Sequence, residues 1–376
     1  MRSQIAIYKG RPKHRGDGCL VTRRPRVMEM MELTNPPTEA TAASAQPADK
    51  TVPRRGGRPL FAAIDVGSNN LRLLVASVQP NGEPKVIDAF SRTVRLGANL
   101  NEQGAIVDQA IEKATNALRI CAKKIQQAGV VNYRAVATEV CRQAINSERL
   151  VTTVKQQTGL DLEVISCAEE ARLAMLGVSP LVEASATDCL VFDIGGGSSE
   201  IVWGQRQDNG ELKFIDHISL PFGVISLADR INETEAARRA SYKSLREELQ
   251  VALMETEQRW QLRERVKAGQ VQVLGASGTV TTLAGVLLGL QKYARHRVDG
   301  TDLPSAQAKH VIDHLLGQNP EERARNGCIG SSRCEMVLPG CAMFEAILGI
   351  WPVDKVRVAD RGVREGILFD LSRQHA

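Results

Sequence analysis

The sequence contains no run of eighteen apolar residues, so no segment is expected to cross a membrane as a helix. It also has no apolar stretch typical of a secretory signal peptide and no CxxC pair. The eight cysteines are scattered among apolar neighbours, which favours reduced thiols and a cytoplasmic location. Cys328, Cys334 and Cys341 lack a short metal-binding spacing, so we expect them to be small buried or half-buried residues.

A zinc motif is missing as well. His310 and His314 stand at i and i+4 on a helix that we expect to start at Asp302-Leu303-Pro304, but the residues between them do not form HExxH and no third ligand is suggested. We therefore expect two ordinary surface or half-buried histidines.

The charge of the chain is unevenly distributed. At 376 residues the chain can form two domains, and its formal net charge is +5. Residues 1–59 carry +7, so the remainder carries −2. The first segment is rich in proline and small residues, and we predict a basic, solvated, disordered tail rather than an arm that binds RNA or a membrane. Met28, Met30 and Met31 leave the true start of the protein open.

One stretch is hard to explain by packing alone, Leu190 to Trp203, which reads LVFDIGGGSSEIVW. An apolar strand ends on Asp193, three glycines follow, and the chain becomes apolar again after Glu200. Glycines let a turn point several backbone N–H groups at one anion, so the stretch is typical of a strand-turn-strand phosphate site. An ordinary tight hairpin is the alternative.

The same pattern occurs 128 residues earlier. After Leu60 an apolar strand ends on Asp65, a polar turn from Gly67 to Asn70 follows, and a second strand begins. Two such units predict two similar domains, each offering one phosphate-binding turn to a shared cleft. Either turn alone is weak support.

A third turn, from Gly275 to Gly278, follows a predicted strand over Val271–Leu274 and precedes a predicted helix over Thr279–Leu290. A glycine-rich turn at a helix N-terminus is a further candidate anion or nucleotide site, although a plain strand-to-helix connection looks much the same.

Glu170 is the most informative single acid outside the turns. Ser166-Cys167-Ala168-Glu169 fits a capping box before an apolar helical run, which gives Glu169 a structural role. Glu170 has no role in the cap and sits just after a strand end, where function collects in α/β proteins. Its alternative role is a favourable charge near the helix dipole. Arg142 and Arg149 are candidates for anion contacts, but from spacing alone we favour surface arginines.

Periodicity and turn residues predict the other elements. The expected strands lie near Lys85–Phe90, Tyr133–Thr138, Leu162–Ile165, Lys213–Pro221 and Val356–Val358. The expected helices span Ala105–Ala128, Ser147–Gln157, Thr234–Trp260 and Glu335–Ile350 (after a break at Pro339-Gly340), and a last helix follows Asp360–Gly366.

From Leu60 to about Arg373 the chain resembles the exopolyphosphatase and guanosine pentaphosphate phosphatase family, within the actin, hexokinase and heat-shock chaperone superfamily. The matching motifs are Asp65-Val66-Gly67-Ser68-Asn69, Ala137-Thr138-Glu139-Val140-Cys141-Arg142, Ile165-Ser166, Glu169-Glu170-Ala171-Arg172-Leu173, Asp193 to Glu200, Gly275-Ala276-Ser277-Gly278-Thr279 and Arg364-Glu365-Gly366. The family usually has Ser at Asn70 and Thr at Ser199; both positions remain polar here.

The resemblance implies an α/β fold with two ribonuclease H-like domains, over 60–182 and 183–376, around a central cleft. It implies hydrolysis of a terminal phosphoryl group, with Glu170 as catalytic base and Arg142 contacting phosphate. The family's metal-associated acids fall on Asp193 and Glu200. Its phosphate loops fall on Gly67, Ser68 and Asn69 and on Gly195, Gly196, Gly197 and Ser198, and the third turn adds Gly278.

The chemistry of these residues agrees with the resemblance. Phosphoryl transfer needs positioning, charge neutralisation and an oriented water. Two loops of N–H groups would hold phosphate, Mg²⁺ on Asp193 would offset its charge, and Glu170 would deprotonate water. Carboxylate oxygens suit a hard cation such as Mg²⁺ better than zinc.

The partner expected from the resemblance is inorganic polyphosphate or a guanosine penta- or tetraphosphate, and the sequence does not choose between them. The oligomeric state stays open, although a homodimer is common among similar proteins, and no membrane or nucleic-acid partner is expected. Longer relatives continue into a further helical region, so weaker processivity on long polyphosphate is a hypothesis. Two other functions remain open: a sugar or acetate kinase, and a non-catalytic nucleotide-responsive scaffold.

Overall fold

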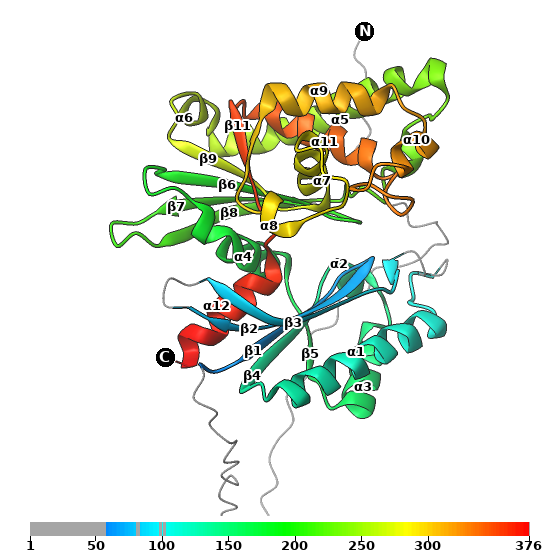
Figure 1. Cartoon of the computed structure of the whole chain (residues 1–376), viewed down its shortest axis with the longest axis vertical. Helices are drawn as coiled ribbons and strands as arrows, with labels where there is room; N and C mark the ends of the chain where they lie inside the picture. Colours follow the sequence, from blue (N-terminus) through cyan, green and yellow to red (C-terminus); the bar gives the residue numbers. More distant parts are fainter. Residues whose placement is uncertain (1–57, 80–82, 98–99, 101–102, 376) are drawn as a thin grey trace, which may run out of the picture. The chain divides into compact units, whose positions relative to one another are not determined.

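Two β-sheets with helices on their faces form the part of the chain that this computed structural model describes, residues 58–79, 83–97, 100 and 103–375 (Figure 1). These residues belong to one compact unit of the chain. The predicted tail lies outside the described residues except for its last two. We call the sheet nearer the N-terminus, with its helices, the first lobe and the other the second lobe.

The first sheet has strand order β3-β2-β1-β4-β5, with β1 to β3 antiparallel and β4 and β5 parallel to β1. Its strands are β1 (Phe61–Val66), β2 (Asn70–Val78), β3 (Pro84–Thr93), β4 (Asn132–Ala137) and β5 (Leu162–Val164). The apolar stripes of α1 (Asp108–Ala128) and α3 (Ser147–Thr158) cover one face. Gly129 ends α1 in the left-handed conformation, as its sequence predicts. The short α2 (Glu139–Gln143) follows β4.

The second sheet repeats this arrangement and adds one edge strand, giving the order β10-β11-β9-β6-β7-β8. Its strands are β6 (Asp188–Ile194), β7 (Ser199–Arg206), β8 (Leu212–Leu220), β9 (Val271–Gly275), β10 (Asp302–Pro304) and β11 (Lys355–Val358). Again three strands are antiparallel, and the next two, β9 and β11, are parallel to the first. The two matching topologies confirm the predicted α/β fold with a duplicated ribonuclease H-like arrangement.

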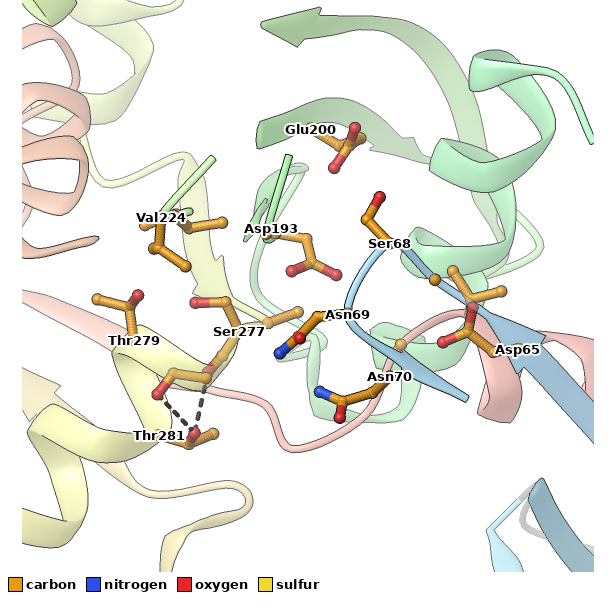
Figure 2. Close-up of a pocket in the computed structure, with 18 of the residues that line it drawn as sticks. Asp65, Ser68, Asn69, Asn70, Asp193, Glu200, Val224, Ser277, Thr279 and Thr281 are labelled. Atoms are coloured by element: carbon orange, nitrogen blue, oxygen red, sulfur yellow. Dashed lines mark hydrogen bonds between the residues drawn. The ribbon is translucent and has the colours of Figure 1, made fainter. Parts of the chain in front are cut away.

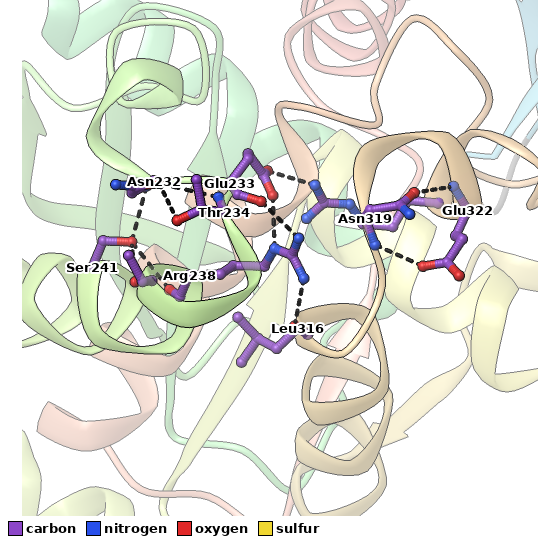
Figure 3. A network of polar contacts seen from close by, with 10 residues as sticks. Asn232, Glu233, Thr234, Arg238, Ser241, Leu316, Asn319 and Glu322 are labelled. Carbon is purple, nitrogen blue, oxygen red and sulfur yellow. Dashed lines mark hydrogen bonds and ion pairs between the residues drawn. The ribbon is translucent and has the colours of Figure 1, made fainter.

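Helices pack on one face of this second sheet around the largest apolar core of the described residues. They are α5 (Glu235–Trp260), α6 (Arg263–Lys267), α7 (Gly278–Leu287), α9 (Ser305–Leu316) and α11 (Val337–Ile350), with the short α8 (Arg295–Val298) and α10 (Pro320–Ala324) between them. A buried polar network joins the start of α5 to α10 (Figure 3). In it Glu233 pairs with both Arg238 and Arg323, two arginines whose side chains are 5% and 0% exposed.

Two helices cross between the lobes. α4 (Cys167–Val178) leaves the first sheet but packs through Met175 and Val178 on the second. α12 (Val363–His375) leaves the second sheet but packs through Ile367 and Leu371 on the first. The two helices also pack on each other, and they lie side by side in Figure 1. The domain boundary between 182 and 183 stays a prediction.

Several local predictions were wrong at helix starts. Asp302–Pro304 is an edge strand rather than the start of a helix, because its backbone pairs with β11 and a proline is tolerated at a sheet edge. Pro339 lies inside the first turn of α11 without breaking it, since the N–H groups of that turn have no intrahelical partner. Asp360–Gly366 does not wholly precede the last helix, which begins at Val363.

The predicted capping box at α4 is only half formed. The Ser166 side chain accepts from the Glu169 backbone N–H at 3.1 Å, as predicted. The Glu169 carboxylate, however, pairs with Arg134 and Arg172, because two cations attract it more strongly than one backbone donor. Glu169 is therefore held in ion pairs and does not share the role of catalytic base that is expected of Glu170.

Candidate active site

The two predicted turns have the same internal geometry. In the first, the Gly67 N–H donates to the carbonyl of Asn70 at 3.0 Å; in the second, the Gly195 N–H donates to the carbonyl of Ser198 at 2.9 Å. Each turn joins the first two antiparallel strands of its sheet, two residues after the acid that lies near the end of the first strand. The backbone N–H groups inside each turn, between the donor and the acceptor of its closing bond, are left to face the space beyond the turn. This is the arrangement that binds anions.

Both turns line one cleft of about 300 Å³. The cleft brings together Gly67, Ser68, Asn69, Glu170, Asp193, Gly195, Gly196, Gly197, Ser198, Glu200 and Gly278, which are all of the predicted site residues except Arg142. In Figure 2 the side chains of Ser68, Asn69 and Asp193 extend into the same space. The shared cleft predicted from the repeated pattern is therefore present.

The third turn closes the opposite side of the cleft. The Ser277 side chain caps α7 by accepting from the Val280 N–H, and its backbone carbonyl accepts from the Thr281 hydroxyl at 2.9 Å (Figure 2). Gly278, the first residue of α7, lines the cleft. A helix N-terminus here adds partial positive charge to the wall of the cleft.

Four carboxylates line the cleft, and burial raises the pKa of each despite the nearby charges of Arg72 and Arg142. Burial, and next the charge of Glu200, raise the pKa of Glu170, while Arg142 opposes the rise. Burial, and then Glu170, raise the pKa of Asp193 to about 7. Burial likewise raises the pKa of Glu200 and of Asp65. Strongly perturbed acids in a cleft are typical of a functional site.

Arg142 does not line the cleft but lies behind Glu170. Its Nη1 donates to Glu170 Oε2 at 2.8 Å and to the carbonyl of Ile165 at 3.0 Å. Its Nη2 is buried and has no hydrogen-bond partner among the described atoms. The structure thus places Arg142 against the predicted base, in the segment that connects β4 with the start of α4.

Sequence reasoning missed several residues that line the cleft. Arg72, Arg333 and Arg364 bring guanidinium groups to it, and Glu139 brings a further carboxylate. Arg72 lies opposite Asp65 in the antiparallel pairing of β1 and β2. An arginine in the otherwise apolar strand NLRLLVASV was a usable signal, whereas Glu139 looked like an ordinary acid in the first turn of a helix.

Comparison with known proteins identifies the family, because residues 74–375 match the Ppx/GppA phosphatase family. The chain belongs to this family. Exopolyphosphatase 2 of Mycobacterium tuberculosis is 26% identical over 331 residues, which are 83% of this chain and 98% of the relative. The guanosine-5'-triphosphate,3'-diphosphate pyrophosphatase of Vibrio vulnificus is 27% identical over 84% of this chain and 60% of the relative.

Solved structures of the Ppx/GppA family have the same architecture. The crystal structure of the Aquifex aeolicus family member superposes with a TM-score of 0.72 at 30% identity, covering 84% of this chain and 98% of that one. The fold described above is thus that of a Ppx/GppA protein.

Other chemistry is poorly represented in the described part of this Ppx/GppA chain. His310 and His314 are exposed on α9, and no three His, Cys, Asp or Glu side chains of the described residues stand close enough to hold a metal by themselves. Cys328 and Cys341 are buried and Cys334 is half-buried, as predicted. No described helix has the length and apolar character needed to span a bilayer.

Proposed function

We propose that this protein removes the terminal phosphate from inorganic polyphosphate. The observation that carries the proposal is the placement of Glu170 in a cleft between two matching anion-binding turns. Phosphoanhydride hydrolysis needs those parts together: donors that hold the phosphoryl oxygens and a base that faces the attacking water.

The chemical step follows from these groups. A water oxygen attacks the terminal phosphorus while Glu170 accepts the proton of that water. The bond from phosphorus to the bridging oxygen breaks, and the bridging oxygen keeps the electron pair. The products are orthophosphate and a chain one phosphate shorter. Gly67 to Asn69, Gly195 to Ser198 and Gly278 hold the phosphoryl oxygens through backbone and hydroxyl donors, which keeps the chain in line with the attacking water.

Mg²⁺ fits the donors that the cleft provides. Asp193 and Glu200 are oxygen ligands, and burial raises the pKa of each carboxyl, so a bound cation would favour their ionised forms. Mg²⁺ in phosphate sites commonly takes one or two carboxylates, with waters and substrate oxygens completing the shell, so a set of three protein ligands is not required. Bound there, Mg²⁺ would offset the charge of the phosphates.

Arg142 acts in this proposal through Glu170. Its hydrogen bonds hold the carboxylate toward the cleft, and its charge favours the ionised form that can accept a proton. The phosphate contacts expected of an arginine are then made by the guanidinium groups that line the cleft, Arg72, Arg333 and Arg364.

Guanosine pentaphosphate is the second candidate substrate. The cleft continues past Gly278 to Tyr293, Met336 and Val337, whose side chains offer a partly apolar surface on which a base can stack. Inorganic polyphosphate would make no use of this surface. The Vibrio vulnificus relative, named for a guanosine substrate, supports this alternative.

Phosphate release by the purified protein tests the proposal, with polyphosphate and guanosine pentaphosphate compared, each with Mg²⁺ and with a chelator. Release should require Mg²⁺ and should fall by about 10²-fold or more in Glu170→Gln. Glu169→Gln is the matched control, because its neighbouring carboxylate pairs with Arg134 and Arg172 outside the cleft.

Three results would count against the proposal. Wild-type turnover in Glu170→Gln would show that Glu170 is not the catalytic base. Tight binding of either substrate without release would favour a non-catalytic scaffold, and transfer of phosphate from ATP to an added sugar or acetate would favour a kinase. Light scattering on the same preparation measures the oligomeric state, which the sequence leaves open.

A further inference from the structure

Glu139 crosses the cleft from the first lobe to the second phosphate turn. It is the first residue of α2, and its Oε2 lies so close to Gly197 that a Cβ on that glycine would collide with it. The nearby Ser198 hydroxyl lowers the pKa of Glu139, against the larger effect of burial, which raises it. The side chain therefore lies directly on the turn that is proposed to hold phosphate.

The charge of Glu139 is weakly compensated in this position. No described ion pair joins it to a cation, so Arg142 acts on it only at longer range, and its Oε1 accepts from the neutral Gln143 amide at 3.0 Å. The Ser198 hydroxyl also lies against Glu200, to which it donates at 2.5 Å. One hydroxyl proton cannot serve two ionised carboxylates, so Ser198 does little to offset the charge of Glu139.

We propose that Glu139 is a specificity-determining residue that occupies the anion position of the second turn with its own carboxylate and weakens phosphate binding there. The identity of the displaced ligand rests on the proposed function. A phosphate chain must move or outcompete this carboxylate before its oxygens reach Gly197 and Ser198. The competition lowers the affinity of every ligand that needs this position by about the same factor, so a ligand that cannot reach the cleft arginines is left with the weakest binding.

The arrangement assists product release for the same reason. Orthophosphate has left its chain and is held mainly by the two turns, so the returning carboxylate competes with it directly. A shortened polyphosphate would still reach Arg333 and Arg364, which line the cleft. Glu139 therefore favours the exit of the small product over the exit of the chain.

Binding of inorganic tripolyphosphate to the full chain, measured by calorimetry without Mg²⁺, tests the inference. Glu139→Gln removes the charge and keeps the size, and Glu139→Ala removes both. The dissociation constant should fall about tenfold in Glu139→Gln, as expected when a like charge near the ligand is removed, and at least as far in Glu139→Ala. Glu148→Gln, an exposed acid on α3 outside the cleft, should bind like the wild type.

Two other outcomes overturn the inference. Unchanged or weaker binding in both Glu139 variants would show that the carboxylate does not compete with phosphate. A higher Mg²⁺ requirement in Glu139→Gln, with unchanged binding in the absence of the metal, would make Glu139 a cation ligand instead. Tighter binding by Glu139→Gln in a protein that releases no phosphate would leave the inference standing and refute the proposed function alone.

Discussion

Arg142 and Glu170 form an ion pair of 2.8 Å in which both side chains are largely buried, 18% and 15% exposed. The arginine is anchored in turn by the carbonyl of Ile165, the residue before the cap of α4. Because little of either side chain reaches solvent, dissolved ions screen this pair less than they screen a surface pair. The pair fixes the direction of the one carboxylate that is proposed to touch the attacking water.

Arg142→Gln should lower kcat by about 10-fold or more and leave KM nearly unchanged, because a group that orients the base acts mainly on the transition state. The variant should also shift the acidic limb of the pH profile to higher pH. Glu170 must be ionised to accept a proton, burial already raises its pKa to about 8, and loss of Arg142 removes a charge that lowers it.

Arg149→Gln is the control, since Arg149 pairs with Asp108 on the surface and should have the wild-type profile. A large rise in KM for Arg142→Gln, with an unmoved pH profile, would instead support a direct phosphate contact.

The pattern of residues along the chain predicted the parts of the site that are local. An apolar strand, an acid and a glycine turn lie within ten residues at both Asp65 and Asp193, so short-range geometry alone shapes each turn. The same repeat predicted two similar domains, and the two sheets have matching strand orders. Helix ends were predicted less well, because the pairing of Asp302–Pro304 with β11 involves residues more than fifty positions away.

The pattern of residues along the chain could not predict contacts between distant segments. Nothing local to α12 indicates that it packs on the first sheet, since an apolar helix face does not specify its partner. The meeting of Glu139 with Gly197 depends on how α2 and the second turn are placed. The ion pair of Arg142 was missed for the same reason, because twenty-eight residues separate it from Glu170.

The buried carboxylates should destabilise the metal-free protein as the pH rises. The folded-state pKa of Glu170 lies above its ordinary value, so between these two values the folded protein keeps a proton that the unfolded chain has lost. Stability therefore falls as the pH rises through this window. Glu170→Gln imitates the protonated form, and it should raise Tm more at pH 8 than at pH 5 when both are measured with a chelator.

Glu169→Gln should behave in the opposite way. Arg172, and then Arg134, lower the pKa of Glu169 against the effect of burial, so its charge contributes stability that is present above the ordinary pKa and lost as the pH falls. Its Tm should fall, and by more at pH 8 than near pH 4. Equal changes of Tm in Glu169→Gln and Glu170→Gln would show that burial does not control the pKa of Glu170.

Glu233 should be important for the stability of the second lobe. It is the shared partner of Arg238 and Arg323, and Arg323 has no exposed surface and two further nitrogens without a partner among the described atoms (Figure 3). Glu233→Gln leaves two buried cations without their counter-charge, which should cost about 3 kcal/mol of unfolding free energy. Urea unfolding measures the loss. Glu321→Gln, an exposed acid on α10, should change it by less than about 0.5 kcal/mol.

Gly366→Ala should separate the two crossing helices. A Cβ at this position of α12 would collide with the carbonyl of Leu173, which lies one turn after Glu170 on α4, so backbone rather than a flexible side chain would have to move. Overpacking of this kind costs about 1–3 kcal/mol. Because α4 carries the proposed base, turnover should fall together with Tm.

Gly362→Ala is the matched control, since a Cβ at that position has no atom within 4 Å. It should leave turnover and Tm close to the wild-type values, which separates the close approach at Gly366 from any general effect of alanine near the start of α12. If Gly366→Ala lowered Tm but kept full turnover, the position of Glu170 would not depend on the contact between α4 and α12. The base would then be held by Arg142 and the cap at Ser166 alone.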